Sequence, residues 1–345
     1  MNLLEIKTLT VRFGGLTAVN TLDLEIQPHE IVSLIGPNGA GKTTVFNAVT
    51  GIHEPTRGRI VFKGAEVCRP FHWRTAASLA FFGFVTGNIL VFAANIEALW
   101  EAAVTAHYQY LKPFPWREAI ASVFSYFTAN PSAHLEWPLG IGIVVGAGGA
   151  YAVWRQSRRA PEIAARAGIA RTFQNIRLFD QMTALDNVLL GMDTQLRSRF
   201  WHDALRLPLF WREHREAEER AMEMLRFVGL EPEAHRLAEN LAYGLQRRLE
   251  IARALAMKPQ LLLLDEPAAG MNPAETVELM QLIQRIRERG ITVFLIEHHM
   301  RVVMGISDRI AVLDHGEKIA EGNPQEVRAD QRVIAAYLGK RMRDE

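Results

Sequence analysis

The sequence predicts an α/β fold built on a parallel β-sheet. Two continuous apolar runs, QLLLLDEP (260–267) and TVFLIEH (292–298), are bounded by turn residues, as buried parallel strands are. The segment between them, ETVELMQLIQRIRERG, has the pattern of a helix, and an earlier apolar run, EIVSLI (30–35), leads into a glycine-rich turn. Strands that alternate with helices in this way indicate a parallel sheet covered by helices.

The remaining elements follow in chain order. Residues 3–12 and 22–27 alternate apolar and polar side chains, which predicts two half-buried strands. TTVFNAVTG predicts a helix that stops at Gly51, and GRIVFKG (58–64) predicts a further strand. Further along the chain, a charged amphipathic helix is expected at 212–229. RIAVLDHGEKIAEG predicts a hairpin, and a last helix is expected at the C-terminus.

Composition excludes several classes of protein. About half of the 345 residues are hydrophobic and about a fifth are charged, the balance of a folded globular protein. The formal net charge of +1 gives no field that would attract nucleic acid, so no nucleic-acid partner is expected. Cys68 is the only cysteine, which excludes an intrachain disulfide and fits a reducing compartment. The charged N-terminus does not have the pattern of a signal peptide.

The glycine-rich turn has the sequence GPNGAGKT (36–43) and fits the pattern G-x-x-x-x-G-K-[ST] in full. It lies between a strand and a helix, the context in which such a loop wraps its backbone N–H groups around phosphates. A chance match in a glycine-rich turn is disfavoured by this context. We therefore expect a P-loop nucleotide site in which Lys42 reaches the outer phosphates and the Thr43 hydroxyl binds Mg²⁺.

Two adjacent carboxylates end the apolar run at 260–267. Asp265 supplies the group that a P-loop enzyme needs on its Mg²⁺, and Glu266 is placed to act as the general base on the attacking water. An acidic pair at the end of a strand can also be a simple turn. Its distance from the upstream P-loop favours the catalytic interpretation.

Further segments resemble the ABC ATPase family, in the order that the family has them. RTFQ (171–174) is similar to the Q-loop, LAYGLQRRLEIARAL (241–255) to the signature motif with its helix, AAGMNP (268–273) to the D-loop and IEH (296–298) to the switch segment. The resemblance implies that Gln174 senses Mg²⁺ and water and that His298 binds the γ-phosphate. Phe13 occupies the position of the aromatic that stacks on adenine, although such a residue is as often part of a core.

The signature and the D-loop depart from the usual family pattern. The signature usually begins Leu-Ser-Gly-Gly-Gln, whereas this chain has Leu241, Ala242, Tyr243, Gly244 and Leu245. Without the Ser hydroxyl, recognition of the γ-phosphate in the opposing subunit is expected to depend on backbone N–H groups near Gly244 and on the helix dipole. The usual D-loop Asp is Asn272. These departures put the rate of hydrolysis in question but not nucleotide binding.

Taken together, the motifs most closely resemble the LivG-like ATPases of branched-chain amino-acid importers, through FGGLTAVN, RTFQNIRLFDQMTALDNV, LDEPAAGMNP and MGISDRI among others. The resemblance implies an ATP hydrolase with ATP and Mg²⁺ as ligands, a parallel core sheet, an antiparallel β subdomain and a helical subdomain at about 171–258. The residues that it assigns to the metal are Thr43, Gln174 and Asp265. Those that it assigns to the nucleotide are Phe13, Gly36, Pro37, Asn38, Gly39, Ala40, Gly41, Lys42, Thr43, Thr44, Leu241, Ala242, Gly244 and Asn272.

The same resemblance implies partners and a location. They are a second ABC ATPase subunit, identical or related, separate permease subunits and, indirectly, a periplasmic solute-binding protein. The chain is then expected at the cytoplasmic face of the inner membrane. Transport of urea, amides or lipids, and a soluble ABC ATPase without a transport role, remain open as alternatives. A soluble translation or repair ATPase is disfavoured by the single nucleotide module and by the absence of a heptad coiled coil.

Residues 69–159 interrupt this pattern with an apolar insertion. Residues 1–68 and 160–345, about three quarters of the chain, carry the family motifs and have a normal length for one such ATPase. Within the insertion, 75–96 carries no charge and is long enough to span a bilayer core of about 30 Å, and 137–154 is also uncharged but of borderline length. An inserted apolar helical hairpin is therefore expected.

Charges around the two segments agree with a hairpin that crosses a membrane. Arginines precede the first segment and follow the second, which favours the cytoplasmic side for both ends. They are Arg69, Arg74, Arg155, Arg158 and Arg159, whereas acidic residues prevail between the segments. Pairs of glycines at helical spacing, 83 with 87 and 142 with 146, allow close helix contact in lipid. A hairpin buried in a soluble subdomain, or one packed on a permease, remains an alternative.

Overall fold

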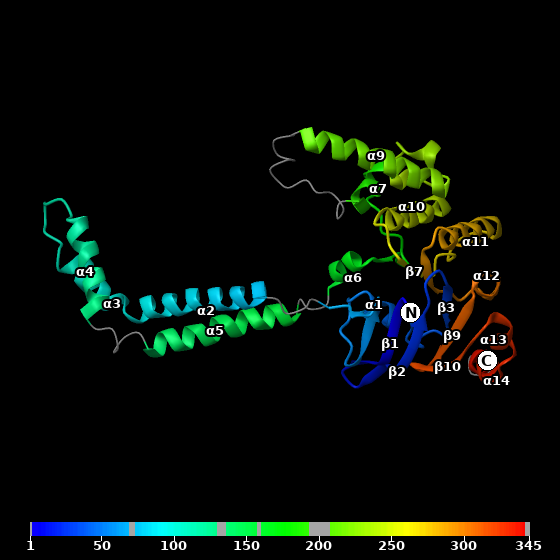
Figure 1. The fold of residues 1–345 in the computed structure, drawn as a ribbon, viewed down its shortest axis with the longest axis horizontal. Helices are drawn as coiled ribbons and strands as arrows, with labels where there is room; N and C mark the ends of the chain where they lie inside the picture. Colours follow the sequence, from blue (N-terminus) through cyan, green and yellow to red (C-terminus); the bar gives the residue numbers. More distant parts are fainter. Residues whose placement is uncertain (1, 69–72, 130–135, 157–159, 193–207, 342–345) are drawn as a thin grey trace. The chain divides into compact units, whose positions relative to one another are not determined.

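The computed structural model describes residues 2–68, 73–129, 136–156, 160–192 and 208–341 (Figure 1). The chain forms two compact units. Unit 1 consists of Met1–Cys68 and Arg159–Glu345, and unit 2 consists of Arg69–Arg158. The predicted flanking residues Arg69, Arg158 and Arg159 lie outside the described residues.

A six-stranded sheet forms the centre of unit 1, with the strand order β10-β9-β3-β8-β7-β6. All neighbouring strands pair in parallel except β10, which forms an antiparallel hairpin with β9 at one edge. Every residue of β3, β7 and β8 is buried, as the continuous apolar runs predict. The strands are β3 (Ile31–Ile35), β6 (Ile169–Arg171), β7 (Leu261–Asp265), β8 (Thr292–Ile296), β9 (Arg309–Asp314) and β10 (Glu317–Gly322). Among them, the short strand β6 was not expected from the sequence.

The two faces of this sheet belong to separate apolar cores. Leu262 and Leu264 of β7 pack with helices α7, α9, α10 and α11, whereas Leu261 and Leu263 pack with α1 and the antiparallel strands. This division follows from the strand period of two, which sends successive side chains to opposite faces. The helices α1 (Lys42–Val49), α11 (Pro273–Glu288) and α12 (Met300–Ile306) follow β3, β7 and β8 directly.

A second sheet is antiparallel throughout, with the order β2-β1-β4-β5. Its strands are β1 (Leu4–Phe13), β2 (Leu16–Ile26), β4 (Arg57–Phe62) and β5 (Ala65–Glu66). Its apolar side chains join the core over α1. The predicted mixed α/β fold, with a parallel core sheet and an antiparallel β subdomain, is thereby confirmed.

The remaining helices of unit 1 form a group and a C-terminal pair. In the group, α7 (Ala184–Met192), α9 (Pro208–Val228) and α10 (Tyr243–Ala256) contact one another through small and branched apolar side chains such as Val188, Ala221 and Leu225. The amphipathic helix expected at 212–229 is therefore α9. The C-terminal pair is α13 (Pro324–Ala329) and α14 (Gln331–Arg341), and the remaining short elements are α6 (Pro161–Ala167), η3 (Glu231–Glu233) and η4 (Ala238–Asn240).

Unit 2 is helical. Its long helices α2 (Trp73–Ala94) and α5 (Glu136–Gln156) lie side by side (Figure 1), and both are long and apolar enough to cross a membrane. Between them are α3 (Ile96–Trp100), the π-helix η1 (Glu101–Thr105) and α4 (Trp116–Ala129). The two apolar segments are thus helices, as expected, while the helices between them were not expected.

Candidate functional site

Four predicted motifs meet at one edge of the parallel sheet. The P-loop follows β3, the RTFQ segment overlaps β6, the acidic pair ends β7 and the switch segment follows β8. Because the carboxyl ends of parallel strands share an edge, these segments converge on one place. A pocket of about 740 Å³ lies there. It is lined by Phe13, Leu16, Thr17, Ala18, Asn38, Gly39, Gly41, Lys42, Thr43, Thr44, Gln174, Glu266, His298 and His315.

The P-loop is held by backbone contacts that only glycine permits. Gly41 has φ +98°, and a Cβ there would lie 2.3 Å from the Ala18 carbonyl oxygen of β2. A Cβ at Gly36 would lie 2.1 Å from the carbonyl oxygen of Leu313 in β9. The buried Lys42 at the start of α1 donates hydrogen bonds to the carbonyl oxygens of Gly36 and Pro37, at 2.8 and 2.9 Å. The loop and the helix N-terminus thus form a preorganised anion cradle.

Asp265 is buried and forms an ion pair that the sequence did not reveal. Arg171 Nη2 lies 2.8 Å from Asp265 Oδ2, and both side chains are almost fully buried. Arg171 Nη1 also donates to the Asn47 side chain of α1 at 2.7 Å, and the guanidinium lies over the rings of Phe46 and Phe173. One arginine therefore ties the predicted metal carboxylate to α1 and to the Q-loop.

Replacement of Arg171 by Leu is expected to destabilise unit 1 by about 3 kcal/mol, because Asp265 would keep a buried charge without its partner. Urea unfolding followed by circular dichroism measures this loss. The matched control is Arg215→Leu on the exposed face of α9, which should change the free energy of unfolding by less than about 0.5 kcal/mol. Equal stability of the two variants would contradict the assigned role of the pair.

Three predicted catalytic side chains meet in the pocket. The Gln174 amide Nε2 donates to Glu266 Oε2 at 2.9 Å, and His298 Nδ1 lies 3.6 Å from the same oxygen. Glu266 has φ +47°, a left-handed conformation that is uncommon for a residue other than glycine. Its carboxylate thus lies between an amide and an imidazole, beside the P-loop. This arrangement can hold and polarise a water molecule.

Glu297 lies immediately behind this group and was not expected to have a role. Its side chain is fully buried and accepts hydrogen bonds from the backbone N–H of Ala268, at 2.9 Å, and of His298 and His299, at 3.0 and 3.2 Å. Ala268 follows the acidic pair by two residues, so one carboxylate joins the D-loop segment to the switch segment. The continuous apolar run before Glu297 was the available signal that this carboxylate is buried.

Glu297→Gln is expected to lower ATP turnover by about 10- to 100-fold while leaving ATP affinity unchanged. The amide would present an N–H₂ group to a backbone N–H, and the resulting shift of His298 would misplace a catalytic group. Phosphate release and binding of a fluorescent ATP analogue separate the two quantities. Exposed Glu219→Gln on α9 is the control, and turnover equal to that of the control would refute this positioning role.

A buried pair on α10 holds the Q-loop by its backbone. Arg247 donates to the carbonyl oxygens of Phe173 and Gln174, at 2.6 and 2.7 Å, and pairs with Glu250 at 2.8 Å. Glu250 in turn accepts from Phe173 N–H at 3.1 Å. Burial raises the pKa of the Glu250 carboxyl above its ordinary value, against the opposing effect of these hydrogen bonds and of Arg247. Hydrogen bonds thus connect the signature helix α10 to the backbone of the Q-loop.

The structure places the other predicted residues in three settings. Phe13 lines the pocket, partly exposed, with its ring edge-on to His53 at 5.1 Å. The predicted residues Gly36, Pro37 and Ala40 are buried behind the lining of the pocket. The predicted residues of the signature and D-loop do not line the pocket. Leu241 is buried, and Ala242 is the N-cap of α10. Asn272 caps α11 in a capping box with Glu275, and a Cβ at Gly244 would lie 2.8 Å from Glu275 Oε1.

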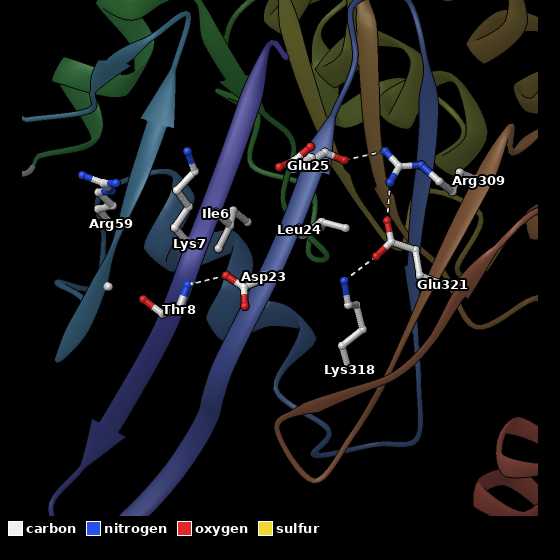
Figure 2. Close-up of a pocket in the computed structure, with 11 residues that line it drawn as sticks. Ile6, Lys7, Thr8, Asp23, Leu24, Glu25, Arg59, Arg309, Lys318 and Glu321 are labelled. Carbon is white, nitrogen blue, oxygen red and sulfur yellow. Dashed lines mark hydrogen bonds and ion pairs between the residues drawn. The ribbon is translucent and has the colours of Figure 1, made fainter. Parts of the chain in front are cut away.

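A second hollow lies between the antiparallel sheet and β9–β10 and contains none of the predicted site residues (Figure 2). Its volume is about 840 Å³. Arg309 is held there by Glu30 and Glu321, and Glu321 also pairs with Lys318. The hydrogen bonds to Glu30 are the main reason that the pKa of Arg309 lies above its ordinary value. Because these charges neutralise one another, the hollow is a poorer phosphate site than the P-loop pocket.

Comparisons with known proteins agree with this geometry. A family model described as "ABC transporter" matches residues 19–91 and 151–269, and one described as "Branched-chain amino acid ATP-binding cassette transporter" matches residues 317–342. The first match leaves out residues 92–150, which lie within unit 2. The high-affinity branched-chain amino acid transport ATP-binding protein LivG of Escherichia coli K12 is 38% identical over 98% of this chain and 98% of its own length.

Solved structures share the fold at lower sequence identity. The ADP conformation of MJ1267, an ATP-binding cassette of an ABC transporter, superposes with a TM-score of 0.64 at 21% identity, covering 98% of this chain and 99% of that one. The ATP-binding cassette MJ0796 has a TM-score of 0.57 at 21% identity, covering 93% and 98%. The family match over more than half of the chain and the relative that aligns over nearly all of it lead to one conclusion: the chain belongs to the ABC transporter ATP-binding proteins and is LivG-like.

Proposed function

We propose that the chain is the subunit that converts ATP hydrolysis into uptake of branched-chain amino acids through separate permease subunits. The observation that carries the proposal is the convergence of Lys42, Gln174, Glu266 and His298 on one pocket, in a chain that aligns with LivG over 98% of its length. Each of these four side chains comes from a different segment of unit 1, so their meeting is a property of the fold.

Binding of ATP would use the P-loop and the side chain of Phe13. The ammonium group of Lys42 would leave the two loop carbonyl oxygens and bind the outer phosphates, assisted by N–H groups at the start of α1. Phe13 would stack on the adenine, since its ring is partly exposed in the pocket. The Thr43 hydroxyl and the Asp265 carboxylate are hard oxygen ligands of the type that Mg²⁺ prefers, with Gln174 nearby. Bound Mg²⁺ would neutralise phosphate charge.

Hydrolysis would depend on the three side chains that meet at Glu266. The Glu266 carboxylate would accept a proton from the attacking water, and the Gln174 amide would orient this carboxylate and the water. His298 would donate a hydrogen bond to the γ-phosphate. Glu297 would hold the backbone at His298 and at Ala268 while this occurs.

Closure of two ATPase subunits would complete the site. Leu241, Ala242, Gly244 and Asn272 lie outside the pocket of their own chain, which fits residues that act on nucleotide bound to a second subunit. MJ0796 is dimeric in its post-hydrolysis state, with bound ADP and phosphate. Closure would move α10, and the pair of Arg247 with Glu250 would carry that movement to the Q-loop. The second subunit would be an identical chain or a related one that carries the same motif residues.

The chain is a subunit of a transporter complex and is therefore associated with a membrane. We place the ATPase unit at the cytoplasmic face, where the helical group of α7, α9 and α10 would press on the permeases. A periplasmic solute-binding protein would meet the complex only on the opposite side.

Uptake assays test this proposal directly. The chain, its permeases and its solute-binding protein are reconstituted in proteoliposomes loaded with ATP, and entry of labelled leucine is compared with entry of labelled urea. Leucine uptake that is lost in Glu266→Gln supports the proposal. ATP hydrolysis that is stimulated by urea or a lipid, with no response to leucine, would overturn the assigned substrate class.

A further inference from the structure

The long helices of unit 2 expose most of their apolar surface. Only 17% of the most apolar 18-residue window is buried in each of the helices α2 and α5. A core helix of a soluble protein is mostly buried, and neither helix lies at the N-terminus as a signal sequence would. Besides Trp73 and Trp137 near the helix ends, the large apolar side chains that are exposed on the two helices are Phe81, Phe82, Phe84, Ile89, Leu90, Phe92, Ile141, Ile143, Val144, Val145, Tyr151 and Val153.

The contact between α2 and α5 is centred on small residues, with Leu139 and Ile143 packed against the glycines of α2. A Cβ at Gly142 would lie 2.4 Å from Gly87 Cα, and a Cβ at Gly146 would lie 1.9 Å from Thr86 Oγ1. The Thr86 hydroxyl oxygen is 2.7 Å from the Gly142 carbonyl oxygen, an interhelical hydrogen bond. A hairpin folded in water places large apolar residues inside and polar ones outside, whereas here most of the large apolar residues face outward. Small residues inside with one polar contact are typical of helices packed in lipid.

The dimensions and the ends of the helices fit a bilayer. At a rise of about 1.5 Å per residue, α2 and α5 are each about 32 Å long, close to a hydrocarbon core of about 30 Å. Because Gly83 faces Ala147 and Gly87 faces Leu139, the helices are antiparallel. Exposed aromatic side chains occur at both ends, Trp73 and Tyr151 at one, and Trp100 and Trp137 at the other. Such belts mark the two membrane interfaces.

Charge distinguishes the two ends of the helix pair. Arg74 and Arg155 lie at the end that connects to unit 1, and the opposite end carries Glu97 and Glu101. Positive residues remain on the cytoplasmic side, so this asymmetry orients the pair with unit 1 in the cytoplasm. The segment between the helices then lies on the far side. Its described residues, 95–129, include a tertiary contact: the Tyr126 hydroxyl donates to the buried Asn95 at 3.0 Å, which ties α4 to the end of α2.

We propose that α2 and α5 cross the lipid bilayer as a hairpin and anchor the ATPase unit independently of any permease, with α3, η1 and α4 exposed beyond the membrane. The occupant of the apolar surface is thus lipid. The proposal rests on the proposed function only in placing unit 1 in the cytoplasm, and its tests do not use ATP or transport.

Carbonate extraction of the full chain, expressed without permeases, tests the membrane insertion. The wild type is expected to remain in the membrane pellet. Val144→Lys places a charge on the lipid face near the middle of α5 and should move most of the chain to the soluble fraction, while Val144→Leu should behave as the wild type. Release of the wild type by carbonate would overturn the proposal, and it is the result expected if the helices only pack on a permease.

Topology is tested with the single natural cysteine. Cys68 precedes α2, so a membrane-impermeant maleimide should label it only after spheroplasts are lysed. In a Cys68→Ser background, Tyr110→Cys places a thiol at an exposed position between η1 and α4, and it should be labelled in intact spheroplasts. Labelling of Tyr110→Cys only after lysis would show that the hairpin does not cross, and would overturn the proposal even if the chain resists carbonate.

Discussion

Glu266→Gln is expected to abolish ATP turnover, with a fall of about 10²- to 10⁴-fold, while ATP affinity is retained or increased. Gln is nearly isosteric with Glu and can still form a hydrogen bond with Gln174, so the pocket keeps its shape. It cannot accept the proton of the attacking water. The variant should therefore accumulate with bound ATP and with two subunits closed, measured by phosphate release, ATP retention and size-exclusion chromatography.

The control for this substitution is Glu288→Gln at the exposed end of α11, which removes the same charge far from the pocket. Its turnover should equal that of the wild type. If Glu266→Gln hydrolysed ATP at the wild-type rate, the proton acceptor would have to be another group, and His298, which is 3.6 Å from Glu266 Oε2, would be the next candidate.

Lys42→Ala should weaken ATP binding by at least about 100-fold. The ammonium group is buried at the start of α1, and its two loop contacts show that its donors point along the P-loop. Two charge-assisted hydrogen bonds to phosphate are worth about 3 kcal/mol together, which corresponds to about two factors of ten in the dissociation constant. Isothermal titration with a slowly hydrolysed ATP analogue measures this change.

Lys112→Ala, at an exposed position of unit 2, serves as the matched control because it removes the same side chain outside unit 1. Circular dichroism should give the same helix content for both variants, since the glycine contacts that fix the P-loop backbone remain. If the Lys42→Ala variant bound ATP as tightly as the control, the loop would have to hold phosphates through backbone N–H groups alone.

Several features of the fold could be predicted from the sequence because they depend on local pattern. The apolar runs at 260–267 and 292–298 had to be buried strands, and the P-loop pattern between a strand and a helix fixed the position of α1. Strand β6 was not predicted because a run of three residues is too short to show a strand periodicity. It forms by pairing with β7. The helices α3 and α4 were missed for a similar reason, since the strong apolar segments on either side dominate the composition of the insertion.

The candidate site likewise has one part that the sequence predicts and another that it does not. The sequence by itself determined the residue types of the P-loop that line the pocket, because a loop suited to wrapping phosphates requires glycine, lysine and threonine at set spacings. Only the tertiary structure decided which buried groups support them. Arg171 reaches Asp265 across 94 positions of sequence, and Glu297 joins Ala268 to the switch segment across 29. Such partners are set by the pairing of β6, β7 and β8, and no local spacing encodes which strands will be neighbours in a parallel sheet.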